Sequence, residues 1–196
     1  MDVARQMSIS QASLRQAAPV AFCALLMLVL TFCPPASAQQ NSPGDLQERI
    51  ERTYSEVVHI TPSELASRLA GGEVIMLIDT REANEFAVGR LAGAERVDPG
   101  IWHTNFMQRF ASRVTGKTIV LYCSVGVRSS KLAAYVQDAM RAAGAKAIYN
   151  LKGGIFAWHN ERRGLVNAKG PTEFVHPYDR YWGRFVERRH LTRQHP

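Results

Sequence analysis

Short apolar runs alternate with helical segments through most of the chain, and this alternation limits its possible folds more than any other feature. The clearest runs are residues 74–79 (VIMLID), 117–122 (KTIVLY) and 146–151 (KAIYNL). Each is short and almost continuously apolar, which is typical of a strand buried on both faces of a sheet. A shorter strand is expected near 94–98, and helices at 46–58, 62–70, 101–114, 129–143 and within 153–164. This order predicts an α/β fold: a central parallel sheet with helices on both faces.

Local signals set the limits of several helices. Thr61, Pro62 and Glu64 have the spacing of a capping box with proline at the first helical position, and Gly71 follows the last helical residue. In the 129–143 helix, Ser129 and Ser130 are expected to cap the N-terminus. One face of that helix is expected to be apolar and buried, with Leu132, Tyr135, Val136 and Met140.

The first 38 residues have the layout of a secretory signal peptide. Arg5 and Arg15 precede an apolar segment at 17–33, and small residues then lead to a cleavage site after Ala38. An uncleaved membrane anchor is an alternative, but the segment has only 17 residues and contains Pro19, against roughly 20 for a membrane span. A lipoprotein attached through Cys33 is disfavoured by the bulky Phe32. Cleavage predicts an exported protein of the bacterial periplasm, with no stable membrane insertion.

The mature chain, residues 39–196, is long enough for one domain with a sizeable core. Removing Asp2, Arg5 and Arg15 lowers the net charge from +7 to +6, and much of the excess lies after residue 180. The positive charge is therefore a feature of the C-terminal tail, and no nucleic-acid partner is expected. The tail is expected to form a helix that docks through an aromatic stripe of Tyr178, Tyr181, Trp182 and Phe185. Binding of its arginines to an anionic surface is the alternative.

Cleavage would leave Cys123 as the one cysteine of the mature chain, so no disulfide can form within it. A buried structural cysteine is the commoner fate of such a residue. Cys123, however, directly follows a predicted strand and precedes a predicted helix, at the edge where α/β sheets bind ligands. The helix N-terminus and the short loop offer backbone N–H groups to an anion. Gly126 permits a tight curl, and Arg128 adds a fixed positive charge.

Two cysteine chemistries use a loop that ends in arginine. Cysteine phosphatases have five residues between the two, which makes room for a tetrahedral phosphoryl group. Here there are four, residues 124–127, and the tighter loop favours a single transferred sulfur atom held as a persulfide. An arsenate reductase is also disfavoured, because no second cysteine is left for an internal relay.

Three stretches together resemble the single-domain rhodanese family of sulfurtransferases: IDTREANEFAVGRLAGA (78–94), YCSVGVRSS (122–130) and YNLKGGIFAWHNERRG (149–164). The resemblance covers roughly residues 57–164 and implies the same α/β fold. Together with the N-terminal pattern, it divides the chain into a signal peptide (1–38), a lead-in with a helix (39–56), the domain (57–164) and a basic, aromatic C-terminal extension packed on the domain (165–196). Arg90 departs from the family, which commonly has histidine there, and should alter a local hydrogen bond only.

The resemblance implies a thiosulfate:cyanide-type sulfurtransferase in which Cys123 is the nucleophile and Arg128 assists. For Arg128, anion binding and a salt bridge that shapes the loop are equally open. The substrate is expected to contact Ser124, Val125, Gly126, Val127 and Ser129. Support near the site is expected from Asp79, Arg81 and Glu85.

The expected substrates are small sulfur-containing anions such as thiosulfate, with thiols, cyanide or a protein as acceptors. No metal or organic cofactor is predicted, because the six histidines lack ligand spacing. A non-catalytic sulfur carrier or partner-binding module is the main alternative function.

Overall fold

The structure is a computed structural model that describes residues 42–196. The predicted signal peptide and its cleavage site lie outside the described residues. Within residues 42–196, no helix is long and apolar enough to cross a membrane.

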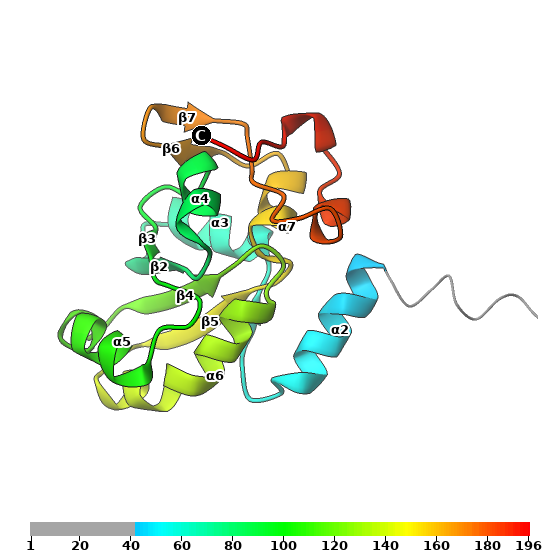
Figure 1. The fold of residues 1–196 in the computed structure, drawn as a ribbon. Coiled ribbons are helices and arrows are strands. Elements are labelled where there is room, and N and C mark those ends of the chain that lie inside the picture. The colour runs from blue at the N-terminus through cyan, green and yellow to red at the C-terminus, as the bar shows by residue number, and fades with distance from the viewer. Residues whose placement is uncertain (1–41) are drawn as a thin grey trace, which may run out of the picture. The chain divides into compact units, whose positions relative to one another are not determined.

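A five-stranded parallel sheet forms the centre of the fold (Figure 1). Its order is β1-β5-β4-β2-β3, and every neighbouring pair is parallel. The predicted α/β fold class is confirmed, and all three long apolar runs form strands. The strands are β1 (His59–Ile60), β2 (Ile75–Asp79), β3 (Glu95–Arg96), β4 (Thr118–Tyr122) and β5 (Ala147–Leu151).

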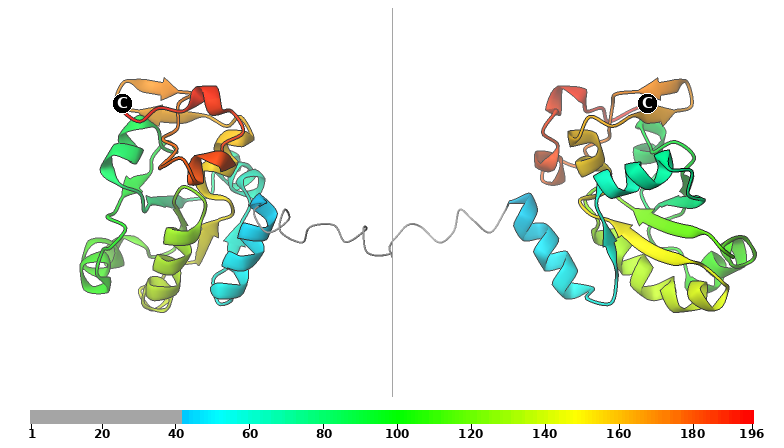
Figure 2. Two further views of the ribbon diagram at one scale, coloured as in Figure 1. Left: turned by 45° about the vertical axis from the view of Figure 1, so that its right-hand side comes forward. Right: turned by 180° about the vertical axis from the view of Figure 1, so that it is seen from behind.

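Helices cover both faces of this sheet (Figures 1 and 2). Successive strand residues point to opposite faces of the sheet, so Leu77 and Ile78 of β2 lie in two different hydrophobic clusters. Helices α5 (His103–Phe110) and α6 (Val127–Ala142) pack into the cluster that contains Ile78. Helices α3 (Pro62–Ala70), α7 (Gly154–Asn160) and α2 (Pro43–Thr53) pack into the cluster that contains Leu77. The short α4 (Ala83–Val88) follows β2.

The predicted capping box of α3 is confirmed: the Glu64 N–H donates to Thr61 Oγ1 at 3.2 Å, and the Thr61 N–H donates to Glu64 Oε2 at 2.9 Å. Other limits differ from the expected ones. Helix α2 ends at Thr53, five residues before the predicted end. The segment 101–114 is helical only over α5, followed by a 3-10 turn at Ala111–Arg113.

Two expectations for α6 were wrong. The helix begins at Val127, and its N-cap is Gly126 at φ +104°, so Ser129 and Ser130 lie inside the first turn. Tyr135 is 56% exposed, although Leu132, Val136 and Met140 of the predicted face are buried. Ala133 packs into the core instead. The Tyr135 ring contacts His103 edge-on, with 5.2 Å between the two ring centroids.

The C-terminal extension does not form the predicted helix. A hairpin of β6 (Leu165–Asn167) and β7 (Gly170–Thr172) comes first, and the aromatic segment contains only a 3-10 turn at Trp182–Phe185. A second 3-10 turn lies at Arg189–Leu191. Pro177 and the left-handed backbone of Tyr178, at φ +67°, interrupt any helix there. Phe185 and Val186 are buried in the cluster that contains Leu77, whereas Tyr178 and Tyr181 are exposed.

Candidate functional site

Cys123 lies at the carboxyl edge of the sheet, directly after β4 and three residues before the N-cap of α6. It is 1% exposed. Its sulfur accepts a hydrogen bond from the Gly126 N–H at 3.2 Å, so the loop curls back over the sulfur atom. This contact places Cys123 Sγ within reach of the loop's backbone donors.

The carbonyl groups of this loop point away from the sulfur. The oxygens of Cys123 and Ser124 accept hydrogen bonds from the N–H groups of Ile155 and Phe156, at 2.8 and 3.1 Å. The Val125 oxygen accepts from Gln47 Nε2 at 3.0 Å. Because a planar trans peptide points its N–H opposite to its C=O, these three peptide units turn the N–H groups of residues 124–126 toward the inside of the loop.

Two glycines allow this packing. Gly126 has φ +104°, a backbone conformation that residues other than glycine rarely adopt. Gly154, at φ +57°, lies so close to the loop that a Cβ there would be 2.3 Å from the Cys123 oxygen. The first turn of α7 therefore supports the loop directly.

An ion pair between the buried Glu85 and the partly buried Arg128 fixes the end of the loop. The Arg128 guanidinium donates to both Glu85 oxygens, at 2.8 and 2.9 Å, and to Ser124 Oγ at 2.9 Å. Ser124 Oγ donates in turn to Glu85 Oε1 at 2.8 Å. Burial disfavours the charge of Glu85, but the hydrogen bonds and charge of Arg128 outweigh it, so the pKa of Glu85 is lowered. Burial likewise opposes the charge of Arg128, but its contacts with Glu85 and with Cys123 raise the pKa of Arg128.

A second pair, which is fully buried, joins Asp79, the last residue of β2, to Arg81 in the turn that follows. Both side chains are fully buried, and Arg81 Nη2 donates to Asp79 Oδ2 at 2.6 Å and to the Gly89 oxygen at 2.7 Å. Burial opposes the charge of Arg81, but Asp79 outweighs it and raises the pKa of Arg81. The guanidinium also donates to the Glu85 carbonyl oxygen at 3.3 Å, which ties this pair to the helix that carries Glu85.

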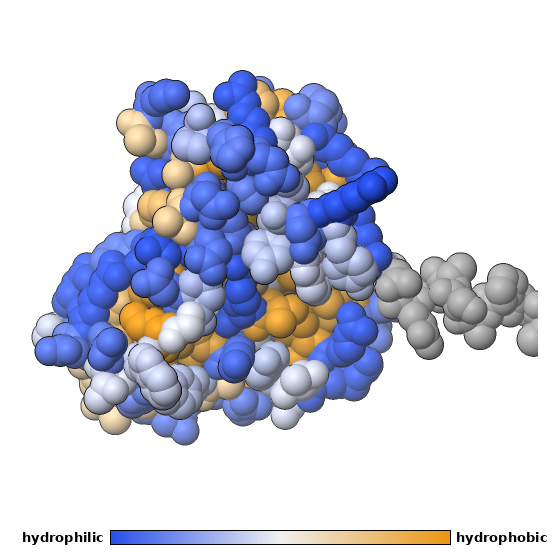
Figure 3. Space-filling view, in the orientation of Figure 1, coloured by the Kyte–Doolittle hydropathy of each residue, from blue (hydrophilic) through white to orange (hydrophobic). Residues whose placement is uncertain are grey.

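A cavity of about 200 Å³ opens over the Cys123 loop. Four residues of the lining follow Cys123 in the loop and the start of α6: Ser124, Val125, Val127 and Arg128. Two further residues, Tyr178 and Trp182, come from the C-terminal extension. A hydrophobic area is visible nearby, between α2 and α6 (Figure 3).

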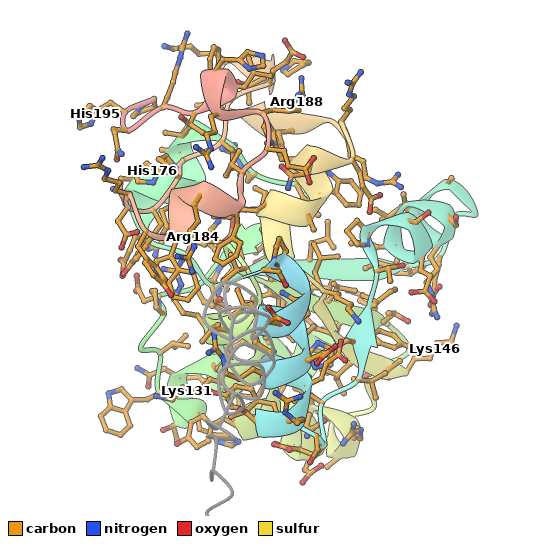
Figure 4. All side chains as sticks on the ribbon, turned by 90° about the vertical axis from the view of Figure 1, so that its right-hand side faces the viewer. Lys131, Lys146, His176, Arg184, Arg188 and His195 are labelled. Atoms are coloured by element: carbon orange, nitrogen blue, oxygen red, sulfur yellow. The ribbon has the colours of Figure 1, made fainter. Side chains whose placement is uncertain are left out.

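The backbone of the extension is held in place next to this cavity. The Tyr178 N–H donates to Nδ1 of the buried His176 at 2.9 Å. His176 and Arg184 both lie in the extension, above Lys131 of α6 (Figure 4). Burial lowers the pKa of His176, against the opposing charge of Glu85. The neutral imidazole is the form that accepts this hydrogen bond.

The structure brings together most of the residues singled out from the sequence. Cys123, Ser124, Val125, Val127 and Arg128 line one cavity, and Gly126 curls behind it. Ser129 is different: it is fully buried and its hydroxyl donates to the Gly126 oxygen at 3.3 Å, so it braces the loop. Asp79, Arg81 and Glu85 lie behind the loop.

Some residues of the site were missed from the sequence. Tyr178 and Trp182 were assigned to a docking helix, and no local pattern shows that they reach the cavity. Gln47 was not singled out either, because its contact with Val125 spans 78 residues. The glycine pair at 153–154, the N-cap and first residue of α7, was a usable signal, since a helix that begins with glycine can approach another backbone closely.

Among the described residues, no cluster of histidine, cysteine, aspartate and glutamate side chains could hold a metal ion.

Comparisons with known proteins identify the family of this domain. A model of the family described as Rhodanese-like domain matches residues 61–161, about half of the chain. The protein YqhL of Bacillus subtilis is 38% identical over 123 residues, which cover 63% of this chain and 81% of that protein.

Two further relatives are longer proteins. The probable adenylyltransferase/sulfurtransferase MoeZ of Mycobacterium tuberculosis is 35% identical over 99 residues, 50% of this chain and 24% of MoeZ. A tRNA uridine(34) hydroxylase of Bordetella parapertussis is 34% identical over 98 residues, 49% of this chain and 39% of that protein. This chain thus matches only a minor part of each, and relatives of this domain include proteins named for different reactions. Because the family model matches residues 61–161, the chain belongs to the family of rhodanese-like domains.

Proposed function

We propose that the protein is a sulfurtransferase that moves a sulfane sulfur from a donor to a thiophilic acceptor through a persulfide on Cys123. The main support is the placement of Cys123 Sγ inside a loop whose N–H groups turn inward, beside a small cavity. Backbone donors stabilise a negative charge without a metal or an added proton.

The reaction divides into two transfers, as in covalent catalysis generally. The Cys123 thiolate attacks the outer sulfur of thiosulfate and forms a new S–S bond. The S–S bond of the donor breaks, and its electron pair leaves with sulfite. An acceptor such as cyanide then attacks the terminal sulfur of the persulfide, forms thiocyanate and returns the thiolate.

Each residue near Cys123 receives a role in this proposal. The N–H groups of Val125, Gly126 and Val127 hold the terminal sulfur, with those of Ser124 and Ser129 at the two ends. Arg128 keeps its pair with Glu85 and attracts the donor anion with the guanidinium edge near Cys123, so it fulfils both roles considered from the sequence. Asp79, Arg81 and Glu85 keep the loop in shape and move no proton.

The wider setting is also a proposal. The layout of residues 1–38 supports export to the periplasm, where thiosulfate, low-molecular-weight thiols or a protein thiol would be the partners. The tight four-residue loop favours this chemistry over phosphoryl transfer.

Steady-state thiocyanate formation from thiosulfate and cyanide tests the proposal. Residues 39–196 should turn over, and the variant Cys123→Ser should show only the uncatalysed rate. A persulfide that forms on Cys123 but passes its sulfur to no acceptor would instead support a sulfur carrier. Hydrolysis of an aryl phosphate that requires Cys123, without sulfur transfer, would support a phosphatase.

A further inference from the structure

Two aromatic residues of the C-terminal extension form one wall of the cavity at Cys123. Tyr178 and Trp182 lie outside residues 61–161, which match the family, so the family match does not explain them. Tyr178 is 42% exposed and therefore lies at the cavity's mouth. Together with Val125 and Val127, these side chains make most of the lining apolar or aromatic.

The backbone of Tyr178 is held in an uncommon conformation. Its φ is +67°, in the left-handed region that residues other than glycine seldom adopt. The hydrogen bond from its N–H to His176 maintains this geometry. A parallel bridge between Val175 and Thr192 and the burial of Phe185 anchor the chain before and after Tyr178. The ring is therefore positioned beside the cavity by several independent contacts.

The positive charge at the cavity, on Arg128, already forms an ion pair. Among the described residues that line it, Arg128 alone is cationic, and its guanidinium pairs with both oxygens of Glu85. It also lies 4.8 Å from the centre of the Tyr178 ring, at cation–π distance. The Arg128 charge that attracts a donor anion is thus shared with Glu85, and the donor also meets an aromatic wall.

We infer that Tyr178 and Trp182 are specificity residues that select sulfur compounds carrying a compact aromatic or apolar group beside the transferred sulfur. This inference rests on the proposed function. The cavity of about 200 Å³ is smaller than the roughly 300–1,000 Å³ of a pocket that encloses a drug-sized ligand. It accommodates the group next to the sulfur, and the rest of a larger substrate extends into solvent past Tyr178.

Two donors with the same reactive group test this inference. Benzenethiosulfonate and methanethiosulfonate are both monoanions that transfer their outer sulfur to the Cys123 thiolate. In each case an S–S bond forms on Cys123, the S–S bond of the donor breaks, and a sulfinate leaves with the electron pair. The measurement is kcat/KM for thiocyanate formation with cyanide, divided by the rate of each donor with free cysteine. Thiosulfate serves as the inorganic reference.

The wild-type protein should prefer benzenethiosulfonate over methanethiosulfonate and thiosulfate by at least tenfold. Tyr178→Asn should remove most of this preference, because asparagine tolerates the left-handed backbone but has no aromatic ring. Trp182→Ala should act in the same direction. Tyr178→Phe should keep the preference, because phenylalanine retains the aromatic ring beside the cavity.

Equal normalised rates of the wild-type protein with the phenyl and methyl donors would overturn the inference while leaving sulfur transfer intact. An equal loss of both rates in a folded Tyr178→Asn variant would do the same, because it would indicate a structural role. If no donor forms a persulfide on Cys123, the proposed function itself fails. The wild-type comparison requires no variant, so the inference can be refuted even if Trp182→Ala does not fold.

Discussion

At the scale of single residues, the site depends on a carboxylate that carries out no chemistry in the proposed reaction. Glu85 is 1% exposed and holds both Arg128 and Ser124, so one side chain fixes two parts of the Cys123 loop. The cost of removing its charge should therefore appear in stability and in sulfur transfer together.

Glu85→Gln should lower the free energy of unfolding by about 2 kcal/mol, since hydrogen bonds to charged partners are lost in a mostly buried place. Glu95→Gln is the matched control, because the Glu95 carboxylate pairs with arginines as well, Arg109 and Arg113, but on the surface. It should cost less than about 1 kcal/mol. Urea unfolding at pH 7 measures both. Equal costs would show that burial of the Glu85 pair is unimportant.

The lowered pKa of Glu85 predicts that the stability of the folded protein depends on pH. The pKa of Glu85 is lower in the folded protein than its ordinary value of 4.5. The folded state therefore binds fewer protons, and the carboxylate stabilises it above pH 4.5. This contribution is lost as the pH falls through the folded pKa. The stability difference between wild type and Glu85→Gln should thus be constant from pH 7 to 5 and shrink below pH 4.5. A difference that grows on acidification would contradict the assignment.

At the scale of elements, the N-terminus of α7 supports the loop between β4 and α6. The N–H groups at this end of α7 donate hydrogen bonds to the carbonyl oxygens of Cys123 and Ser124. The loop lies so close to Gly154 that no side chain fits there. The conformation of the Cys123 loop thus depends on contacts with a helix more than thirty residues further along the chain.

Gly154→Ala should displace this loop, because its Cβ would be 2.3 Å from the Cys123 oxygen and its φ is +57°. We expect a loss of about 3 kcal/mol in the free energy of unfolding and a slower formation of the persulfide. Gly164→Ala is the control, because nothing lies within 4 Å of its Cβ position and its φ is not positive. Chemical denaturation and single-turnover labelling measure the two effects. Normal persulfide formation in Gly154→Ala would refute the support role.

Local sequence signals explain what could be predicted at this scale. The runs that became β2, β4 and β5 are buried on both faces, and the Thr61–Glu64 spacing encodes its own cap. The helix predicted around Trp182 failed because Pro177 and the left-handed backbone of Tyr178 interrupt it. The bridge that ties Val175 to Thr192, 17 residues along the chain, has no local sequence signal. The pairing of Glu85 with Arg128 spans 43 residues, so the sequence placed both near the site but did not show their contact.

At the scale of the whole molecule, the C-terminal extension belongs to the same core as the sheet. Val175 and Val186 are fully buried, and Asn160 of α7 donates to the Phe185 oxygen at 2.9 Å. The described residues, 42–196, belong to one compact unit. The aromatic wall of the cavity is therefore coupled to the stability of the domain.

Phe185→Ala should lower the free energy of unfolding by about 3 kcal/mol, as expected for a large side chain removed from a core. Tyr181→Ala, at an exposed position, should change it by less than about 0.5 kcal/mol. Far-UV circular dichroism and tryptophan fluorescence should report a single coincident transition in both variants. Earlier unfolding of the fluorescence signal, which includes Trp182, would show that the extension unfolds independently.

The central claim is that Cys123 carries sulfur. Intact-protein mass spectrometry of residues 39–196 after incubation with thiosulfate or benzenethiosulfonate tests it most directly. The account predicts a gain of one sulfur atom that is absent in Cys123→Ser and is removed by cyanide, with release of thiocyanate. Unchanged mass with both donors, in a protein shown to be folded, would contradict it.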